Sequence, residues 1–162
     1  MRMKLEFEGK TMMKRNCECR EDLFYVCSLI EFTGRKTCNR RGVILSKLSD
    51  EQLRHQLEYA DLNHSLPFDR VCDELCSAND IEKGDFDTIT GCPYSIPTVT
   101  AIGKVYSRLI ADADSGAGVL SDMRKVFGSF IVDEISDFKN GVYCENPSYL
   151  LESFKSGRLL PW

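Results

Sequence analysis

Apolar side chains recur every three or four positions along most of this chain, and that spacing predicts amphipathic helices. The helices predicted in this way cover residues 20–36, 43–48, 50–64, 66–76, 97–110, 120–138 and 147–156. The pattern therefore predicts an all-α fold, a compact bundle of six or seven helices. Short helices form an N-terminal cluster in this scheme, and the two helices at 97–138 form a long C-terminal hairpin.

The 162 residues suit one domain. We expect a peripheral N-terminal segment at residues 1–19, an N-terminal helical lobe at 20–78 and a C-terminal hairpin lobe at 97–162. Residues 79–96 are rich in Asp, Gly and Thr and predict a connector between the two lobes. Because both lobes carry apolar faces, we expect them to pack into a single compact body.

Polar residues mark several of the predicted helix ends. Ser49 precedes Gln52 by three positions, which is the pattern of a capping box. Asn39 is placed to cap the helix at 43–48, and Ser65 to cap the helix that follows. Pro67 would then lie in the first turn of that helix.

The helix predicted at residues 20–36 carries charges that suit its dipole. Glu21 and Asp22 lie near its expected start, and Arg35 and Lys36 lie near its expected end. This arrangement indicates a helix that begins close to Arg20.

The stretch GRKTCNRRG is the strongest local concentration of charge, with Arg35, Lys36, Arg40 and Arg41 lying between two predicted helices. Helix-turn-helix DNA-binding proteins place such residues around the recognition helix. However, the next helix, VILSKL, offers few polar groups to read bases, and the net charge of the chain is −4. We therefore predict a protein partner at this basic turn and keep nucleic acid as the alternative.

The stretch HSLPFDRVCDELC contains a candidate metal site, formed by His64, Cys72 and Cys76. Cys72 and Cys76 are one helical turn apart and also fall on the apolar stripe of their helix. Buried thiols behave as small hydrophobic groups, so we predict packing rather than metal binding, and no cofactor.

Two further candidates concern catalysis. Cys92 precedes a proline in the loop GCPY, yet a nucleophilic cysteine needs a base, and neither histidine stands at a recognisable spacing from it. Asp133, Glu134 and Asp137 lie opposite the apolar face of their helix, which predicts a solvated surface or a contact with a basic partner. A small metal-dependent or thiol hydrolase is therefore a third hypothesis.

The N-terminal sequence MRMKLEFEGK lacks the apolar core of a signal peptide, and no run of apolar residues reaches the length of a membrane span. The eight cysteines show no repeating interval. We expect a soluble cytoplasmic protein with free thiols and no membrane contact.

Residues 22–78 contain YVCSLIE, then Gly42 and Val43, a leucine-bearing helix, LNHS and VCDEL. This order resembles a family of short bacterial helical proteins of uncharacterised function. The resemblance implies an all-helical unit, and because some members occur beside toxin-like enzymes, it also implies a neutralising or accessory partner. Together with the pattern of charges, it favours a non-enzymatic interaction or regulatory protein.

Overall fold

The computed structural model describes the backbone of residues 2–161 and the side chains of residues 20–161. Over residues 2–161 it contains nine α-helices, one short 3-10 helix and no strand, so the all-α prediction is confirmed. The elements are α1 (Arg2–Thr37), α2 (Arg41–Ser46), α3 (Asp50–Glu58), α4 (Ala60–Asn63), α5 (Phe68–Asn79), α6 (Val99–Asp112), α7 (Val119–Phe127), α8 (Phe130–Ser136), η1 (Val142–Cys144) and α9 (Pro147–Ser156). The side chains of residues 1–19 lie outside the described ones, so the peripheral role expected for that segment stays a prediction.

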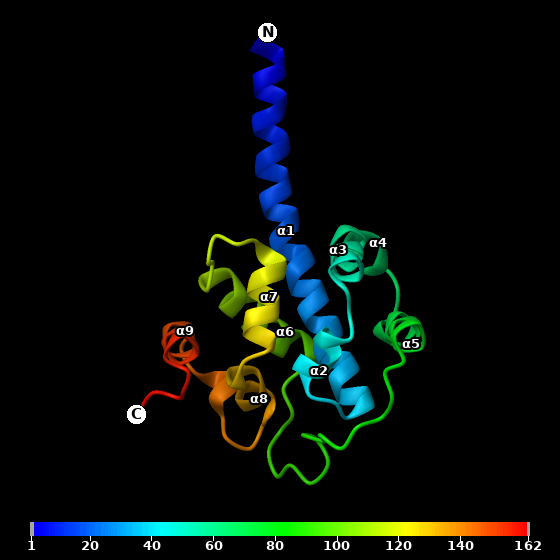
Figure 1. Ribbon diagram of the computed structural model, residues 1–162, viewed down its shortest axis with the longest axis vertical. Coiled ribbons are helices and arrows are strands. Elements are labelled where there is room, and N and C mark those ends of the chain that lie inside the picture. The colour runs from blue at the N-terminus through cyan, green and yellow to red at the C-terminus, as the bar shows by residue number, and fades with distance from the viewer. Residues whose placement is uncertain (1, 162) are drawn as a thin grey trace.

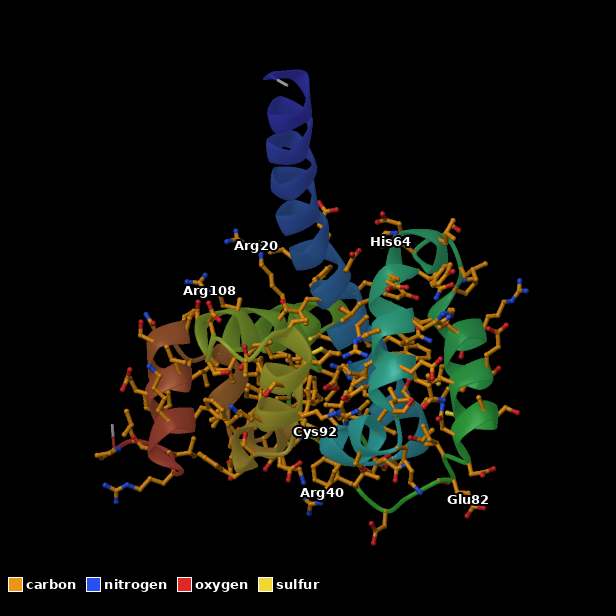
Figure 2. All side chains as sticks on the ribbon, turned by 45° about the horizontal axis from the view of Figure 1, so that its top comes forward. Arg20, Arg40, His64, Glu82, Cys92 and Arg108 are labelled. Carbon is orange, nitrogen blue, oxygen red and sulfur yellow. The ribbon has the colours of Figure 1, made fainter. Side chains whose placement is uncertain are left out.

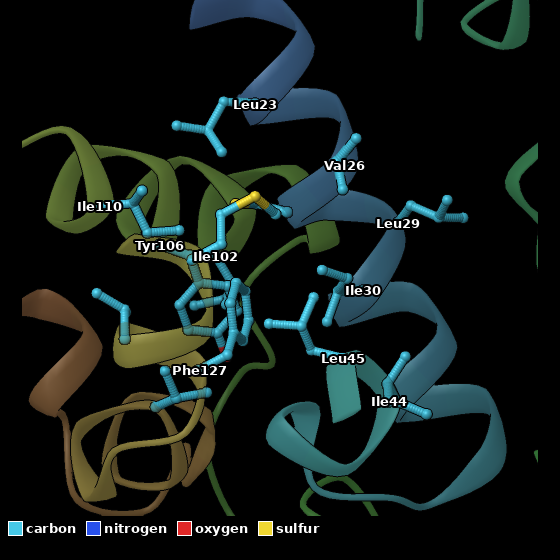
Figure 3. Close-up of a cluster of buried hydrophobic side chains, with 14 of the residues drawn as sticks. Leu23, Val26, Leu29, Ile30, Ile44, Leu45, Ile102, Tyr106, Ile110 and Phe127 are labelled. Atoms are coloured by element: carbon cyan, nitrogen blue, oxygen red, sulfur yellow. The ribbon is translucent and has the colours of Figure 1, made fainter. Parts of the chain in front are cut away.

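Helix α1 is the axis of the fold, with α3–α5 on one side of it and α6–α9 on the other, and α2 lies near its C-terminal end against α7 (Figure 1). Its most extensive packing is against α6, which comes from the other predicted lobe. Leu23 and Ile30 of α1 face Ile102 and Tyr106 of α6 in a core that Figure 3 shows in close-up. The apolar stripes of the two lobes therefore bury one another in a common interior.

The expected connector has no regular secondary structure between α5 and α6, but backbone hydrogen bonds join it to the C-terminal end of α1. The Gly84 N–H donates to the Thr37 carbonyl at 2.8 Å, and the Phe86 N–H donates to the Cys38 carbonyl at 2.8 Å. Further along, the Thr90 hydroxyl and the backbone N–H groups of Thr90 and Ile89 donate to Asp87, which lowers the pKa of that carboxyl to about 2.

Two predicted helices are each split, which explains why nine helices are found where six or seven were expected. The helix predicted at 120–138 is interrupted because Ser129 has an extended backbone, and its hydroxyl donates to the Val126 carbonyl at the end of α7. The prediction of one continuous helix as the second arm of the C-terminal hairpin is therefore wrong, because α7 and α8 occupy that stretch. The helix predicted at 50–64 is likewise divided at Tyr59 into α3 and α4.

The predicted helix ends were partly right. The capping box of Ser49 and Gln52 is present. Asn39, however, does not cap α2, because its side-chain amide donates to the Glu82 carbonyl at 2.8 Å. Ser65 donates to the Leu62 carbonyl rather than capping α5, and Pro67 takes the N-cap position.

The start of α1 was also wrongly predicted. The helix begins at Arg2, so Glu21 and Asp22 lie in its middle and cannot serve its N-terminal dipole. Arg35 and Lys36 do lie in its last turn, as expected. Within the part of the chain that the structure describes, no helix is both long enough and apolar enough to cross a membrane.

The capping box gives a first testable prediction. The Ser49 hydroxyl accepts from the Gln52 N–H at 3.1 Å, and the Gln52 side chain accepts from the Ser49 N–H at 2.9 Å. Replacing Ser49 with alanine is expected to lower the free energy of unfolding by about 1 kcal/mol. Urea denaturation followed by circular dichroism would measure the loss. Ser77→Ala, an exposed position inside α5, is the matched control and should cost nothing; equal effects of both variants would contradict the assignment.

Candidate interaction surface

Arg41 of the basic turn lies inside the protein, not on its surface. Its side chain and that of Glu31 are both fully buried, and the guanidinium donates from Nε to Oε1 at 3.0 Å and from Nη2 to Oε2 at 2.6 Å. This is a two-pronged pairing of a planar guanidinium with a carboxylate. Burial alone would lower the pKa of Arg41, but the hydrogen bonds and charge of Glu31 outweigh it and raise the pKa.

Two more side chains donate hydrogen bonds to the Glu31 carboxylate. The Tyr106 hydroxyl of α6 donates to Oε1 at 2.9 Å, and Arg35 Nε donates to Oε2 at 3.1 Å. Burial, and next the charge of Glu31, raise the pKa of Tyr106 well above its ordinary value, so the phenol stays a proton donor. Glu31 thus links α1, α2 and α6 through charge-assisted hydrogen bonds.

Gly34 makes room for this network. A Cβ at that position would lie 2.5 Å from Cδ of Arg41 and 2.7 Å from its Nε. The Arg41 side chain therefore passes directly over the backbone of α1, which only glycine permits there.

Lys36 and Arg40 are exposed, but each is paired within the protein. Lys36 Nζ bonds Asp69 at 2.8 Å and Asp73 at 2.9 Å, and these hydrogen bonds raise the pKa of its ammonium group. Arg40 bonds Asp133 at 2.7 Å. Each pair joins the basic turn to another helix, either α5 or α8.

The basic turn is therefore mainly a junction between helices. The expectation that Arg41 forms part of an exposed contact is wrong, because its side chain is fully buried and paired with Glu31. Arg35 is 12% exposed and stacks its guanidinium on the Phe138 ring. Partner binding by the remaining members, Lys36 and Arg40, and the nucleic-acid alternative, stay predictions.

The candidate metal residues do not converge. Cys72 and Cys76 lie 3.9 Å apart between their sulfur atoms, against the core. Burial, followed by the charge of Cys72, raises the pKa of Cys76 to about 11, so it carries a neutral thiol near neutral pH. His64 instead lies beside the Tyr25 ring, with centroids 6.0 Å apart. Among the described side chains, no group of three or more His, Cys, Asp and Glu residues could hold a metal ion.

The other candidates have local partners. Cys92 is half-buried against the core, near Tyr143. Asp133 is paired with Arg40, and Glu134 accepts from the Asn140 side chain at 2.9 Å. These contacts give each group a structural role at the surface.

A cavity of about 330 Å³ opens at the junction of α1 with α4. Three carboxylates line it, those of Glu21 and Asp22 on α1 and of Asp61 on α4. The other lining residues are Phe24, Tyr25, Ala60 and His64. Anionic groups are thus gathered around aromatic rings, an arrangement that suits a cation.

Tyr25 is held rigidly at the wall of this cavity. Its ring stacks on Phe68 of α5 at 5.7 Å, and Phe68 stacks in turn on Phe32 at 5.5 Å. Tyr25 is 4% exposed, and its buried hydroxyl has no hydrogen-bond partner among the described residues. Burial also raises the pKa of Tyr25. An unsatisfied buried hydroxyl is uncommon in a folded protein and calls for an explanation.

Large apolar side chains are exposed next to the cavity. Leu62 on α4 is 67% exposed, and Tyr59, which precedes α4, is 43% exposed and stacks on His55 at 4.4 Å. We call this region, with its carboxylates and rings, the corner surface. Its members are Glu21, Asp22, Tyr25, Tyr59, Asp61, Leu62 and His64. Figure 2 places His64 and Arg40 at opposite ends of the folded body, so the corner surface is separate from the basic turn.

Comparison with known proteins gave no match to any family model, curated protein or solved structure.

The corner surface was not recognised in the sequence, although one signal was available. Leu57, Ala60 and His64 share a stripe of the predicted helix at 50–64, and Leu62 falls off that stripe. An off-stripe leucine marks exposure when the helix is otherwise polar. Nothing local to Glu21 and Asp22 indicated that they would line a cavity, because their partner Asp61 lies forty residues away in sequence.

Proposed function

We propose that this protein is a non-enzymatic interaction protein that binds a protein partner through the corner surface. The observation that carries the proposal is the exposure of Leu62 and Tyr59 at α4, the helix that also brings Asp61 to the acidic cavity. An exposed apolar patch with a polar rim is typical of a contact between proteins. The carboxylates favour a partner whose own surface is basic at the rim.

The resemblance of residues 22–78 to short bacterial helical proteins gives this partner a candidate identity. It would be a toxin-like enzyme that the present protein neutralises or assists. That identity rests on the resemblance alone and stays a prediction.

Site-specific photo-crosslinking tests the proposal. A photoreactive phenylalanine derivative replaces Leu62 in one version of the protein and Lys139, an exposed residue that follows α8, in the control version. In cells of the native host, the Leu62 version is expected to trap one protein that the Lys139 version does not. Equal products from both versions would contradict the proposal.

The trapped protein would then be purified and titrated against variants. Leu62→Ser removes exposed apolar surface without touching the core, so the fold should persist. The dissociation constant is expected to rise about tenfold, as for a central apolar contact of an interface. An unchanged dissociation constant would show that the corner surface is not the contact.

A further inference from the structure

We propose that Asn140 is a site of spontaneous covalent modification, at which the side-chain amide becomes a carboxylate through a cyclic imide formed with Gly141. The site lies in the loop between α8 and η1 and is independent of the corner surface. Such chemistry needs an exposed asparagine, a following residue without a Cβ, and an amide folded over the next peptide nitrogen. All three conditions are met in this loop.

The sequence supplies the first two conditions. Asn140 is the only asparagine in the chain that glycine follows, and its side chain is exposed to water. A Cβ on the following residue would crowd the approach of its backbone nitrogen to the amide, and glycine removes that obstacle. The Gly141 N–H has no hydrogen-bond partner among the described residues, so no contact holds its nitrogen away from the reaction.

The fold supplies the third condition. Oδ1 of Asn140 accepts from the Val142 N–H at 3.0 Å, two residues along the chain, which is the hydrogen bond of an Asx turn. That bond folds the amide over the intervening Gly141 peptide, and it also polarises the carbonyl carbon Cγ towards attack. Nδ2 of Asn140 donates to Oε2 of Glu134 at 2.9 Å, which holds the amide in this position.

Water is the only co-reactant that the conversion needs. The Gly141 nitrogen forms a bond to Cγ of Asn140 and gives up its proton, while the bond from Cγ to Nδ2 breaks and ammonia leaves. Water then adds to one of the two carbonyl carbons of the cyclic imide and opens the ring. Cleavage of the new bond to Cγ leaves an aspartate. Cleavage of the original peptide bond leaves an isoaspartate, whose main chain runs through Cγ.

Either product removes the amide that donates to Glu134. In the aspartate product, a second carboxylate faces Glu134 where the hydrogen bond was. The isoaspartate product lengthens the main chain just before η1, whose Val142 side chain is buried in the core. Because η1 packs on α8, the modification weakens the attachment of these two elements to each other.

Peptide mass spectrometry of the folded full-length protein, incubated in mildly alkaline heavy-oxygen water, tests the proposal. Asn140 is expected to convert with uptake of one solvent oxygen, and enzymatic methylation of isoaspartyl carboxylates should detect the second product. Asn146 is the internal control, because its Oδ1 accepts from the Ser148 N–H at 2.9 Å in the same kind of turn. Pro147 follows it and has no N–H to lose, so Asn146 should stay intact. Equal conversion of both asparagines would overturn the cyclic route. An intact Asn140, under conditions that convert the urea-unfolded chain, would overturn the site.

Variants separate the reaction from its consequence. Gly141→Ala is expected to slow the conversion of Asn140 several-fold, because its methyl group crowds the attacking nitrogen, and circular dichroism would first show that the variant folds. If it does not fold, the comparison of Asn140 with Asn146 decides. Asn140→Asp reproduces one product and should raise the equilibrium constant of unfolding about threefold, through repulsion from Glu134. Asn146→Asp keeps a carboxylate oxygen as the cap of α9 and should leave that constant unchanged. An undiminished conversion rate in folded Gly141→Ala would overturn the cyclic route, and full stability in Asn140→Asp would overturn the weakening.

Discussion

Replacing Arg41 with alanine is expected to lower the free energy of unfolding by about 3–5 kcal/mol, the usual cost of removing one partner of a buried ion pair. The Glu31 carboxylate would keep its full burial but lose the two-pronged pairing with Arg41. The remaining donors, Tyr106 and Arg35, cannot replace both hydrogen bonds. Guanidinium chloride denaturation under reducing conditions, followed by circular dichroism, would measure the change.

Two companion variants make the result specific. Lys36→Ala, which breaks the exposed pairs with Asp69 and Asp73, should cost far less because water and salt screen them. The double variant Glu31→Gln with Arg41→Met removes the two fully buried charges and keeps an amide oxygen for Tyr106, but it leaves Arg35 without a counter-charge, so it should recover only part of the loss. If Arg41→Ala costs no more than Lys36→Ala, the pair is not the buried junction that the structure shows.

The same network shows where sequence reasoning fails. The cluster of Arg35, Lys36, Arg40 and Arg41 has the appearance of a basic surface because the counter-charges of Lys36 and Arg40 are distant in sequence. Asp69 and Asp73 lie on α5 and Asp133 lies on α8, and only the fold brings them to the turn. Glu31, by contrast, lies on α1 one helical turn before Arg35. Charge patterns in one segment cannot reveal pairing across segments, whereas an apolar stripe is complete within its own helix.

For helix ends too, features local to one segment could be predicted from the sequence, and features that depend on other segments could not. The capping box of Ser49 and Gln52 is entirely local, and it was predicted correctly. The break at Ser129 lies where α2 packs on the end of α7, and a Cβ on Gly42 would collide there with the Phe127 carbonyl oxygen. The apolar spacing runs through this break without interruption, so periodicity alone predicts one helix where the fold requires two.

The second prediction with a large effect on stability concerns the close packing of α1 against α6. Replacing Gly103 with alanine is expected to lower the free energy of unfolding by about 2 kcal/mol, since overpacking a core outweighs the gain in helix propensity. The added Cβ would collide with the Ser28 hydroxyl and lie 2.8 Å from Ser28 Cα. The second contact is with backbone, so no rotation of the serine side chain can relieve it. The two helices must move apart, and the apolar groups that Figure 3 draws between them must lose contacts.

Denaturation of Gly103→Ala alongside two companions tests this packing. Lys104→Ala, an exposed neighbour on the same helix, should change stability little. Ser28→Gly combined with Gly103→Ala removes the hydroxyl contact but leaves Cα in place, so it should restore only part of the loss. Full stability in Gly103→Ala alone would mean that α1 and α6 do not approach as closely as described. In that case the buried hydrogen bond from Tyr106 of α6 to Glu31 of α1 would also lose its geometric basis, because it spans the same interface.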